Sequence, residues 1–213
     1  MLKISKAKLI ITSVLILLPV FAGVILWDKL PETMVTHWGV GNAPDGFSSK
    51  PVAVFGLPLF LLAIHWVCLF ATKADPKSKN INPRMLDLVL WICPVLSIVM
   101  GTVTYSYSLG YEVNVQSVAT IIVGVMFVIV GNYLPKCKQS YTMGIKLPWT
   151  LSDEENWNKT HRLAGKLWVA CGIIMLVMSF VQGIAVMAVT LAFAVIVPTV
   201  YSYILFRKKK NNK

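Results

Sequence analysis

Six long apolar segments, separated by short polar ones, most constrain what this chain can fold into. They cover approximately residues 9–27, 51–72, 85–108, 116–134, 164–182 and 184–206. A helix needs about 20 apolar residues to cross roughly 30 Å of hydrocarbon, and each segment approaches or exceeds that length. Because 56% of the residues are hydrophobic and the mean hydropathy is +0.69, we expect an all-α polytopic membrane protein with six transmembrane helices.

The basic residues predict the orientation of these helices. Eighteen of the 20 Lys and Arg residues fall in the termini and polar segments that share one side, and only Lys29 and Lys50 fall on the other. Basic residues beside membrane spans stay in the cytoplasm, so we expect both termini inside (N-in/C-in) and residues 28–50 outside. The net charge of +11 therefore indicates topology rather than nucleic-acid binding. We expect the four cysteines to be packing thiols.

Residues 28–50, the outer loop, form the longest segment expected outside the cell. Met34–Trp38 is a candidate for extended structure, and the turn-forming residues around it are Gly39, Gly41, Pro44, Asp45 and Gly46. The loop is therefore expected to be folded. Its aromatic residues are either an interfacial belt at headgroup depth or part of a lid that meets an external ligand.

The polar segment before the fifth span, residues 144–162, reads GIKLPWTLSDEENWNKTHR. Ser152 and Glu155 have capping-box spacing, which predicts a helix that starts at Ser152. If this helix continues into the span, Trp157, His161, Ala164 and Trp168 share one face. An interfacial amphipathic helix accounts for these residues. It does not account for GIKLPWT, whose glycine, proline and tryptophan predict a fixed turn packed under the bundle.

Other residues predict helix ends and helix packing. Asn82 followed by Pro83 is typical of an N-cap and first helical position, so the third span should start there. Gly124 with Gly131, and Gly165 with Gly172, are spaced at seven residues. Each pair therefore lies on one helix face and favours close helix packing.

The run from Gly144 to Ser152, followed by Trp157, Thr160-His161-Arg162 and Gly165, resembles the signature of the SdpI family of bacterial immunity proteins. Leu30-Pro31, His37-Trp38, Pro44-Asp45-Gly46 and Ser49-Lys50 resemble the domain of unknown function that precedes it in longer members. The family usually has Arg and Thr where this chain has Lys146 and Leu147, and Lys lacks the planar fork of Arg.

The resemblance implies two domains. Residues 1–80 would be an N-terminal two-helix hairpin that carries the folded extracellular loop 28–50. Residues 81–213 would be an SdpI-like four-helix region with a cytoplasmic signature loop at 135–165.

The resemblance also implies function in the bacterial cell membrane. Such a protein protects the producing cell from a secreted, SdpC-like membrane-active peptide toxin, and relays the toxin's presence by holding a cytoplasmic DNA-binding repressor at the membrane. Anionic lipid headgroups are a third expected partner, and no direct nucleic acid, cofactor or metal is expected. The expected partner-binding residues are Gly144, Lys146, Pro148, Trp149, Thr150, Trp157, Thr160, His161 and Arg162. The expected toxin-binding residues are His37, Trp38, Pro44, Asp45 and Gly46.

Two other classes of function remain as alternatives. A membrane enzyme would need convergent catalytic groups, but His37, His65 and His161 are expected at different depths, and His65 with Cys68 makes only half a zinc site. We therefore expect no enzyme and no catalytic residues. A small-solute or peptide transporter is the second alternative, although few ionisable groups lie deep in the spans.

Overall fold

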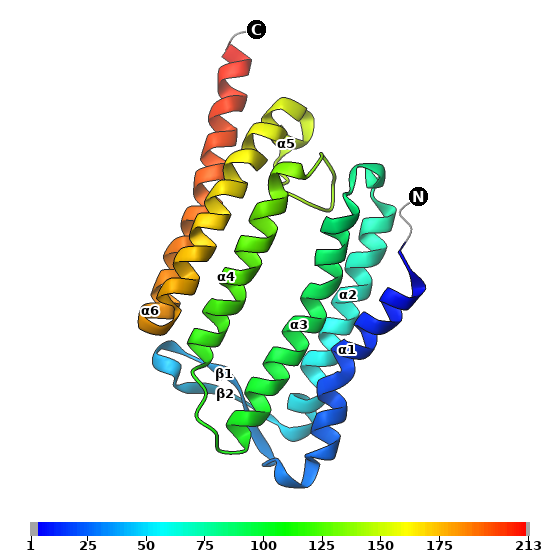
Figure 1. The fold of residues 1–213 in the computed structure, drawn as a ribbon, viewed down its shortest axis with the longest axis vertical. Coiled ribbons are helices and arrows are strands. Elements are labelled where there is room, and N and C mark those ends of the chain that lie inside the picture. The colour runs from blue at the N-terminus through cyan, green and yellow to red at the C-terminus, as the bar shows by residue number, and fades with distance from the viewer. Residues whose placement is uncertain (1–3, 212–213) are drawn as a thin grey trace. The chain divides into compact units, whose positions relative to one another are not determined.

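A computed structural model of the chain describes residues 4–211, apart from the side chains of residues 182–184. Within this range, six helices are long and apolar enough to cross a membrane (Figure 1), which confirms the expected fold class. The helices are α1 (Lys6–Ile25), α2 (Leu57–Ala74, extended to Val52 by a wide turn), α3 (Pro83–Ser108), α4 (Val115–Tyr133) and α6 (Glu154–Asn211). Helix α6 contributes two spans, Glu154–Val181 and Ala185–Asn211, as the arms of a hairpin.

The chain divides into two compact units. The first unit comprises Lys3–Ala71 with Asp87–Val115, and the second comprises Thr72–Leu86 with Gln116–Lys213. The loop between α2 and α3 therefore belongs to the same unit as the predicted signature loop. The sequence-based domains 1–80 and 81–213 describe family segments, and they stay a prediction.

In the first unit, hydroxyl groups of α3 bind backbone carbonyls of α1. Tyr105 donates to the Pro19 carbonyl oxygen at 2.8 Å, and Ser97 donates to that of Ile16 at 2.6 Å. Gly101 permits the close approach, because a Cβ there would lie 2.6 Å from Pro19 Cβ.

The outer loop contains a β-hairpin of β1 (Thr33–Trp38) and β2 (Pro44–Ser49). The expected extended segment is confirmed, but the expected turn at Pro44–Gly46 is wrong, because these residues begin β2. The turn lies earlier, where Gly41 and Asn42 have φ of 78° and 65°. These are the residue types that tolerate left-handed backbone.

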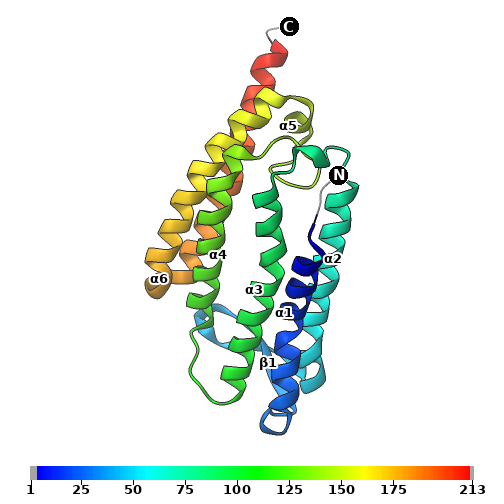
Figure 2. The same cartoon turned by 45° about the vertical axis from the view of Figure 1, so that its right-hand side comes forward.

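In the second unit, α4 packs closely on the first arm of α6 (Figures 1 and 2). A Cβ on Gly172 would lie 2.6 Å from the Gly124 carbonyl oxygen, and a Cβ on Gly165 would lie 2.7 Å from that of Gly131. The glycine pairs thus face each other, which confirms the predicted close packing. Nearby, the Phe127 and Trp168 rings stack with centroids 4.6 Å apart.

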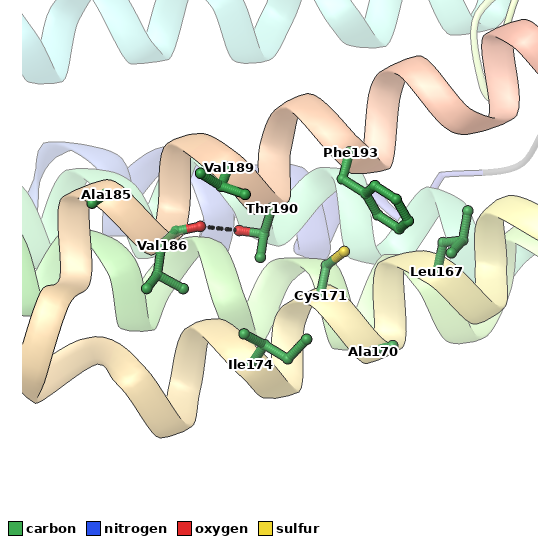
Figure 3. Close-up of a pocket in the computed structure, with 9 residues that line it drawn as sticks. All are labelled: Leu167, Ala170, Cys171, Ile174, Ala185, Val186, Val189, Thr190 and Phe193. Carbon is green, nitrogen blue, oxygen red and sulfur yellow. Dashed lines mark hydrogen bonds between the residues drawn. The ribbon is translucent and has the colours of Figure 1, made fainter.

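The two arms of α6 are joined by Trp168, whose indole Nε1 donates to the Ala194 carbonyl oxygen at 3.1 Å. An apolar groove of about 480 Å³ runs between the arms (Figure 3). Thr190 lines it, but its hydroxyl donates to the Val186 carbonyl of its own helix at 2.6 Å. None of the four cysteines, all within the described residues, forms a disulfide. Cys93, Cys137 and Cys171 are buried, as expected of packing thiols, whereas Cys68 is exposed.

Candidate functional site in the signature loop and the outer loop

His161 and Trp157 form the buried centre of the signature loop (residues 135–165). Their rings stack with centroids 4.0 Å apart, and both side chains are at most 1% exposed. The Ile145 N–H donates to His161 Nε2 at 2.8 Å, and His161 Nδ1 lies 2.8 Å from the Trp157 carbonyl oxygen. Because Nε2 accepts and a carbonyl cannot donate, these bonds assign a neutral imidazole with its proton on Nδ1.

Gly144 lets the loop pass directly over this stack. Its φ is +106°, and a Cβ would lie 2.5 Å from His161 Nε2 and 2.7 Å from Trp157 Cζ2. A side chain would therefore meet both an unfavourable backbone conformation and two buried rings. Trp157 Nε1 donates to the Cys137 carbonyl at 2.7 Å, and burial raises the pKa of the Cys137 thiol to about 11.

Thr150 closes the turn that GIKLPWT was expected to form. Helix α5 (Pro148–Ser152) starts with proline at its first position, where no N–H is needed. The hydroxyl of Thr150 accepts from the Leu147 N–H at 2.9 Å and donates to the Ile145 carbonyl at 2.8 Å. Thr150 is fully buried, so its function is to hold the turn.

Asp75, in the loop between α2 and α3, holds the signature loop from the side. Its Oδ2 accepts from the N–H groups of Tyr141 and Thr142 at 2.9 Å each and from the Thr142 hydroxyl at 2.7 Å. Oδ1 accepts from the Lys77 N–H at 2.8 Å. Burial by itself would raise the pKa of Asp75, but the bonds from Thr142, Lys77 and Tyr141 outweigh it and lower that pKa.

Gln139 extends this clamp. Its amide Nε2 donates to the carbonyls of Thr150 and Leu151 at 2.8 Å each, satisfying the end of α5. Its backbone carbonyl accepts from Asn80 Nδ2 at 2.8 Å, and its side-chain oxygen accepts from the Lys77 ammonium. The loop between α2 and α3 thus contacts the signature loop at both Asp75 and Asn80.

Trp149 anchors α5 on the second arm of α6. Its Nε1 donates to the Ser202 hydroxyl at 2.9 Å, and its ring packs against Tyr203 and Phe206 at centroid distances of 5.4 and 6.0 Å. Asn156 Nδ2 donates to the Ser202 carbonyl at 2.9 Å. The Thr160 hydroxyl in turn donates to Asn156 Oδ1 at 3.0 Å.

The start of α6 differs from the capping box that the sequence suggested. Asp153 is the cap, with Oδ1 accepting from the N–H groups of Glu155 at 3.0 Å and Asn156 at 3.4 Å. Ser152 instead ends α5, and its hydroxyl donates to the Trp149 carbonyl at 3.3 Å. A hydrogen bond from Lys209 is the main cause of the lowered pKa of Asp153.

The structure divides the expected partner-binding residues into two groups. Lys146, Pro148 and Arg162 are exposed, and Trp149 and Gly144 are partly buried. The other four, Thr150, Trp157, Thr160 and His161, are buried and shape the loop from inside. Lys146 donates to the Thr142 carbonyl at 3.2 Å, so it needs none of the bidentate geometry that an arginine would offer there.

The expected toxin-binding residues lie together on the outer hairpin. His37 Nδ1 and Asp45 Oδ1 are 2.5 Å apart across the two strands, and both side chains are largely exposed. Gly46 lies against His37, since a Cβ there would be 2.6 Å from His37 Cβ. Trp38 packs edge-on to Tyr107 at 5.5 Å, and its buried indole N–H has no partner among the described residues.

Two residues outside the expected toxin-binding set fasten the outer hairpin. Asn42 Nδ2 donates to the Val113 carbonyl at 2.9 Å, and Asn42 Oδ1 accepts from the Val115 N–H at 2.8 Å. Lys50 is 5% exposed and donates to the Trp27 carbonyl at 3.1 Å, while pairing with Glu32 at 2.8 Å. Sequence reasoning missed Asn42, whose only signal is its place after the turn-forming Gly41. Lys50 is one of the two outer cations and part of the resemblance, but its role in fastening the hairpin was not predicted.

The histidines do not converge in any part of the chain that the structure describes. Over residues 4–211, no group of three or more His, Cys, Asp or Glu residues has the arrangement of a metal site. His65 is buried in α2 and its Nε2 lies 3.1 Å from the Thr12 hydroxyl. It therefore has a structural partner on a neighbouring helix, as expected of a polar group in a span.

Six spans with a tightly hydrogen-bonded signature loop and a folded outer hairpin define a multi-pass cell-membrane protein. Residues 136–202 match the SdpI/YfhL protein family, and residues 14–62 match the Domain of unknown function (DUF1648). The chain is 32% identical over 209 residues to Immunity protein SdpI of Bacillus subtilis (strain 168), covering 97% of this chain and 99% of that protein. The chain belongs to the SdpI family. No solved structure matches it.

Proposed function

We propose that this chain is an immunity protein that protects the producing cell from a secreted, membrane-active peptide toxin of the SdpC type. The observation that carries the proposal is the match over 97% of the chain to a protein named for immunity. A match of that extent includes both the outer loop and the signature loop. The fold supports action by binding rather than catalysis, because the buried His161 already uses both ring nitrogens in backbone contacts.

We infer that the toxin is met first at the outer hairpin. His37 and Asp45 offer an exposed, hydrogen-bonded imidazole–carboxylate pair, and Trp38 follows His37 in the same strand. The rival site is inside the bilayer, around Pro58, His65 and Pro94, since a membrane-active peptide partitions into lipid.

We infer a second function for the signature loop, which is to hold a cytoplasmic DNA-binding repressor at the membrane when toxin is present. Lys146, Pro148 and Arg162 are exposed and available to a protein partner, with Trp149 partly exposed beside them. The buried residues beneath them fix the shape of this surface. Anionic lipid headgroups are the third proposed partner of the basic residues at this end of the spans.

This proposal requires the N-in/C-in orientation, which the distribution of basic residues supports. Single cysteines, Ser48→Cys in the outer loop and Ser152→Cys in the signature loop, can be introduced into a cysteine-free background. With an impermeant thiol reagent on intact cells, only Ser48→Cys should react. Reaction of Ser152→Cys from outside would reverse the orientation and place the repressor surface on the wrong side.

The site of toxin capture can be tested by survival of a toxin-sensitive strain that expresses the chain. Trp38→Ala, or replacement of residues 44–46 by a flexible Gly/Ser linker, should abolish protection at unchanged protein level. Val40→Ala is the matched control in the same hairpin, because Val40 is 85% exposed and outside the proposed contact. Full protection by both loop variants would move capture to the spans.

A further inference from the structure

Four cations lie close in sequence to the contact between the end of α4 and the first arm of α6. The short turn Leu134–Lys136 follows α4, and a Cβ on Gly165 would lie 2.6 Å from Pro135 Cδ. At about 100° per residue, Arg162 and Lys166 lie roughly 60° and 100° around the helix from Gly165, on one side of it. Lys136 and Lys138 follow Pro135 directly, and all four side chains are exposed.

These cations have no carboxylate of their own. Among residues 4–211, the ion pairs of the second unit join Lys159 and Lys209 to Asp153 and Glu155, and none involves the four cations around Gly165. Asp75 is also occupied, because it binds Tyr141, Thr142 and Lys77. The four therefore form a local excess of positive charge beside the helix seam.

Their place along α6 indicates headgroup depth. Between Lys166 and Arg207 the sequence contains no Asp, Glu, Lys, Arg or His. This uncharged stretch includes most of both arms of α6, so Lys166 marks the last charged turn of the first arm before the hydrocarbon.

We propose that Lys136, Lys138, Arg162 and Lys166 form a binding site for the phosphate group of an anionic phospholipid. Arg162 offers a planar fork suited to a phosphate, and the lysines add point charges around it. A lipid is favoured over an acidic protein because Lys136 ends one span and Lys166 immediately precedes the uncharged stretch of the next. Lys146 and Trp149, assigned above to a protein partner, are not part of this site, whereas Arg162 belongs to both surfaces. The site makes the anionic-lipid partner proposed above specific, and it does not require the immunity function.

The test uses the purified full-length chain in detergent and the midpoint temperature of unfolding. Adding dioleoylphosphatidylglycerol should raise the midpoint more than adding dioleoylphosphatidylcholine does. The combined variant Lys136→Gln, Lys138→Gln, Arg162→Gln and Lys166→Gln should lose most of that difference. A control with the same charge change in the same unit, Lys73→Gln, Lys79→Gln, Arg84→Gln and Lys208→Gln, should keep it.

Three results would overturn the proposal. The first is an equal loss in the control variant, which would mean diffuse attraction. The second is an equal rise with soluble glycerol phosphate, which would mean a site for free anions. The third is a rise with polyglutamate but not with phosphatidylglycerol, which would assign the surface to an acidic polypeptide.

If the combined variant unfolds too easily to be compared, native mass spectrometry offers a second measurement. The parent should retain more bound phosphatidylglycerol than the variant does. Equal retention by the two proteins contradicts the proposal. Neither measurement involves toxin. A negative result would therefore contradict the lipid site and would not bear on the immunity proposal.

Discussion

Asp75 holds Thr142 by two hydrogen bonds to one carboxylate oxygen, from the backbone N–H at 2.9 Å and from the hydroxyl at 2.7 Å. The two residues are 67 positions apart in the chain, and Asp75 lies outside the segment that matches the SdpI/YfhL family. The signature loop therefore depends on a residue that its own sequence does not contain. The loop between α2 and α3 therefore belongs with the signature loop in the candidate site.

Asp75→Asn should loosen the signature loop without unfolding the protein. An amide has one acceptor oxygen and no charge, so the bonds from Tyr141 and Thr142 lose their charged acceptor and the Lys77 N–H loses its partner. Bonds to a charged group are worth about 1.5–3 kcal/mol each, and bonds between neutral groups about 0.5–1.5 kcal/mol. Hydrogen exchange should show faster exchange of these two amides, by about tenfold or more. Asp87→Asn is the control, because Asp87 pairs with Lys8 in the first unit. If the Tyr141 and Thr142 amides exchange as slowly in Asp75→Asn as in the parent, the negative charge of Asp75 is not needed to hold the signature loop.

The same clamp predicts a pH dependence. The pKa of Asp75 is lower in the folded protein than its ordinary value of 3.8, so ionised Asp75 stabilises the fold. That contribution is complete above the ordinary value and is lost as the pH falls through the lowered pKa. Protection of the Tyr141 and Thr142 amides, corrected for intrinsic exchange, should therefore persist to pH 5 and decline below about 4. A decline already complete at pH 6 would contradict the assignment.

Gly144→Ala should be much more damaging than the same change at another glycine with positive φ. At Gly144 the new Cβ meets His161 and Trp157, whereas at Gly110, with φ of +90°, nothing lies within 4 Å. Backbone strain of about 1 kcal/mol is expected at both, and overpacking adds about 1–3 kcal/mol at Gly144 only. Stability is measured by denaturant unfolding in detergent. Equal losses in the two variants would mean that the Trp157 and His161 rings shift to accommodate the added methyl group.

Gly165→Ala tests the glycine seam between α4 and α6. The added Cβ would lie 2.6 Å from Pro135 and 2.7 Å from the Gly131 carbonyl, and neither is the end of a flexible side chain. We expect a loss of about 1–3 kcal/mol. Gly56→Ala is the control, since its Cβ would lie 3.6 Å from Val52 in ordinary contact. A Gly165→Ala protein as stable as the parent would show that the seam can widen.

Local patterns were sufficient for the spans and for some of their ends. Hydropathy predicted all six spans, and Asn82 caps α3 as expected, with Oδ1 accepting from the Arg84 N–H at 2.9 Å. The signature motif led to the right family. These features depend on residues that are close in sequence, or on apolar runs long enough to cross the bilayer as one helix.

The errors come from places where several local solutions compete. Ser152 and Asp153 are both residue types that cap helices well. Asp153 caps α6 because Ser152 is already the last residue of α5. Pro44-Asp45-Gly46 has the composition of a turn, but Gly41-Asn42 provides the left-handed backbone instead. The contacts of Asp75, Gln139 and Asn42 bridge distant segments, so no local pattern could reveal them.

The most direct test of immunity is the toxin concentration that kills half of a sensitive bacterial population expressing this chain. An SdpC-like peptide is the probe, and membrane insertion of the protein is verified by fractionation. We predict a concentration at least tenfold higher than for cells with an empty vector, and an unchanged concentration for killing by an unrelated membrane-active peptide. Equal killing of both populations by the SdpC-like peptide, with the protein correctly inserted, would contradict the account.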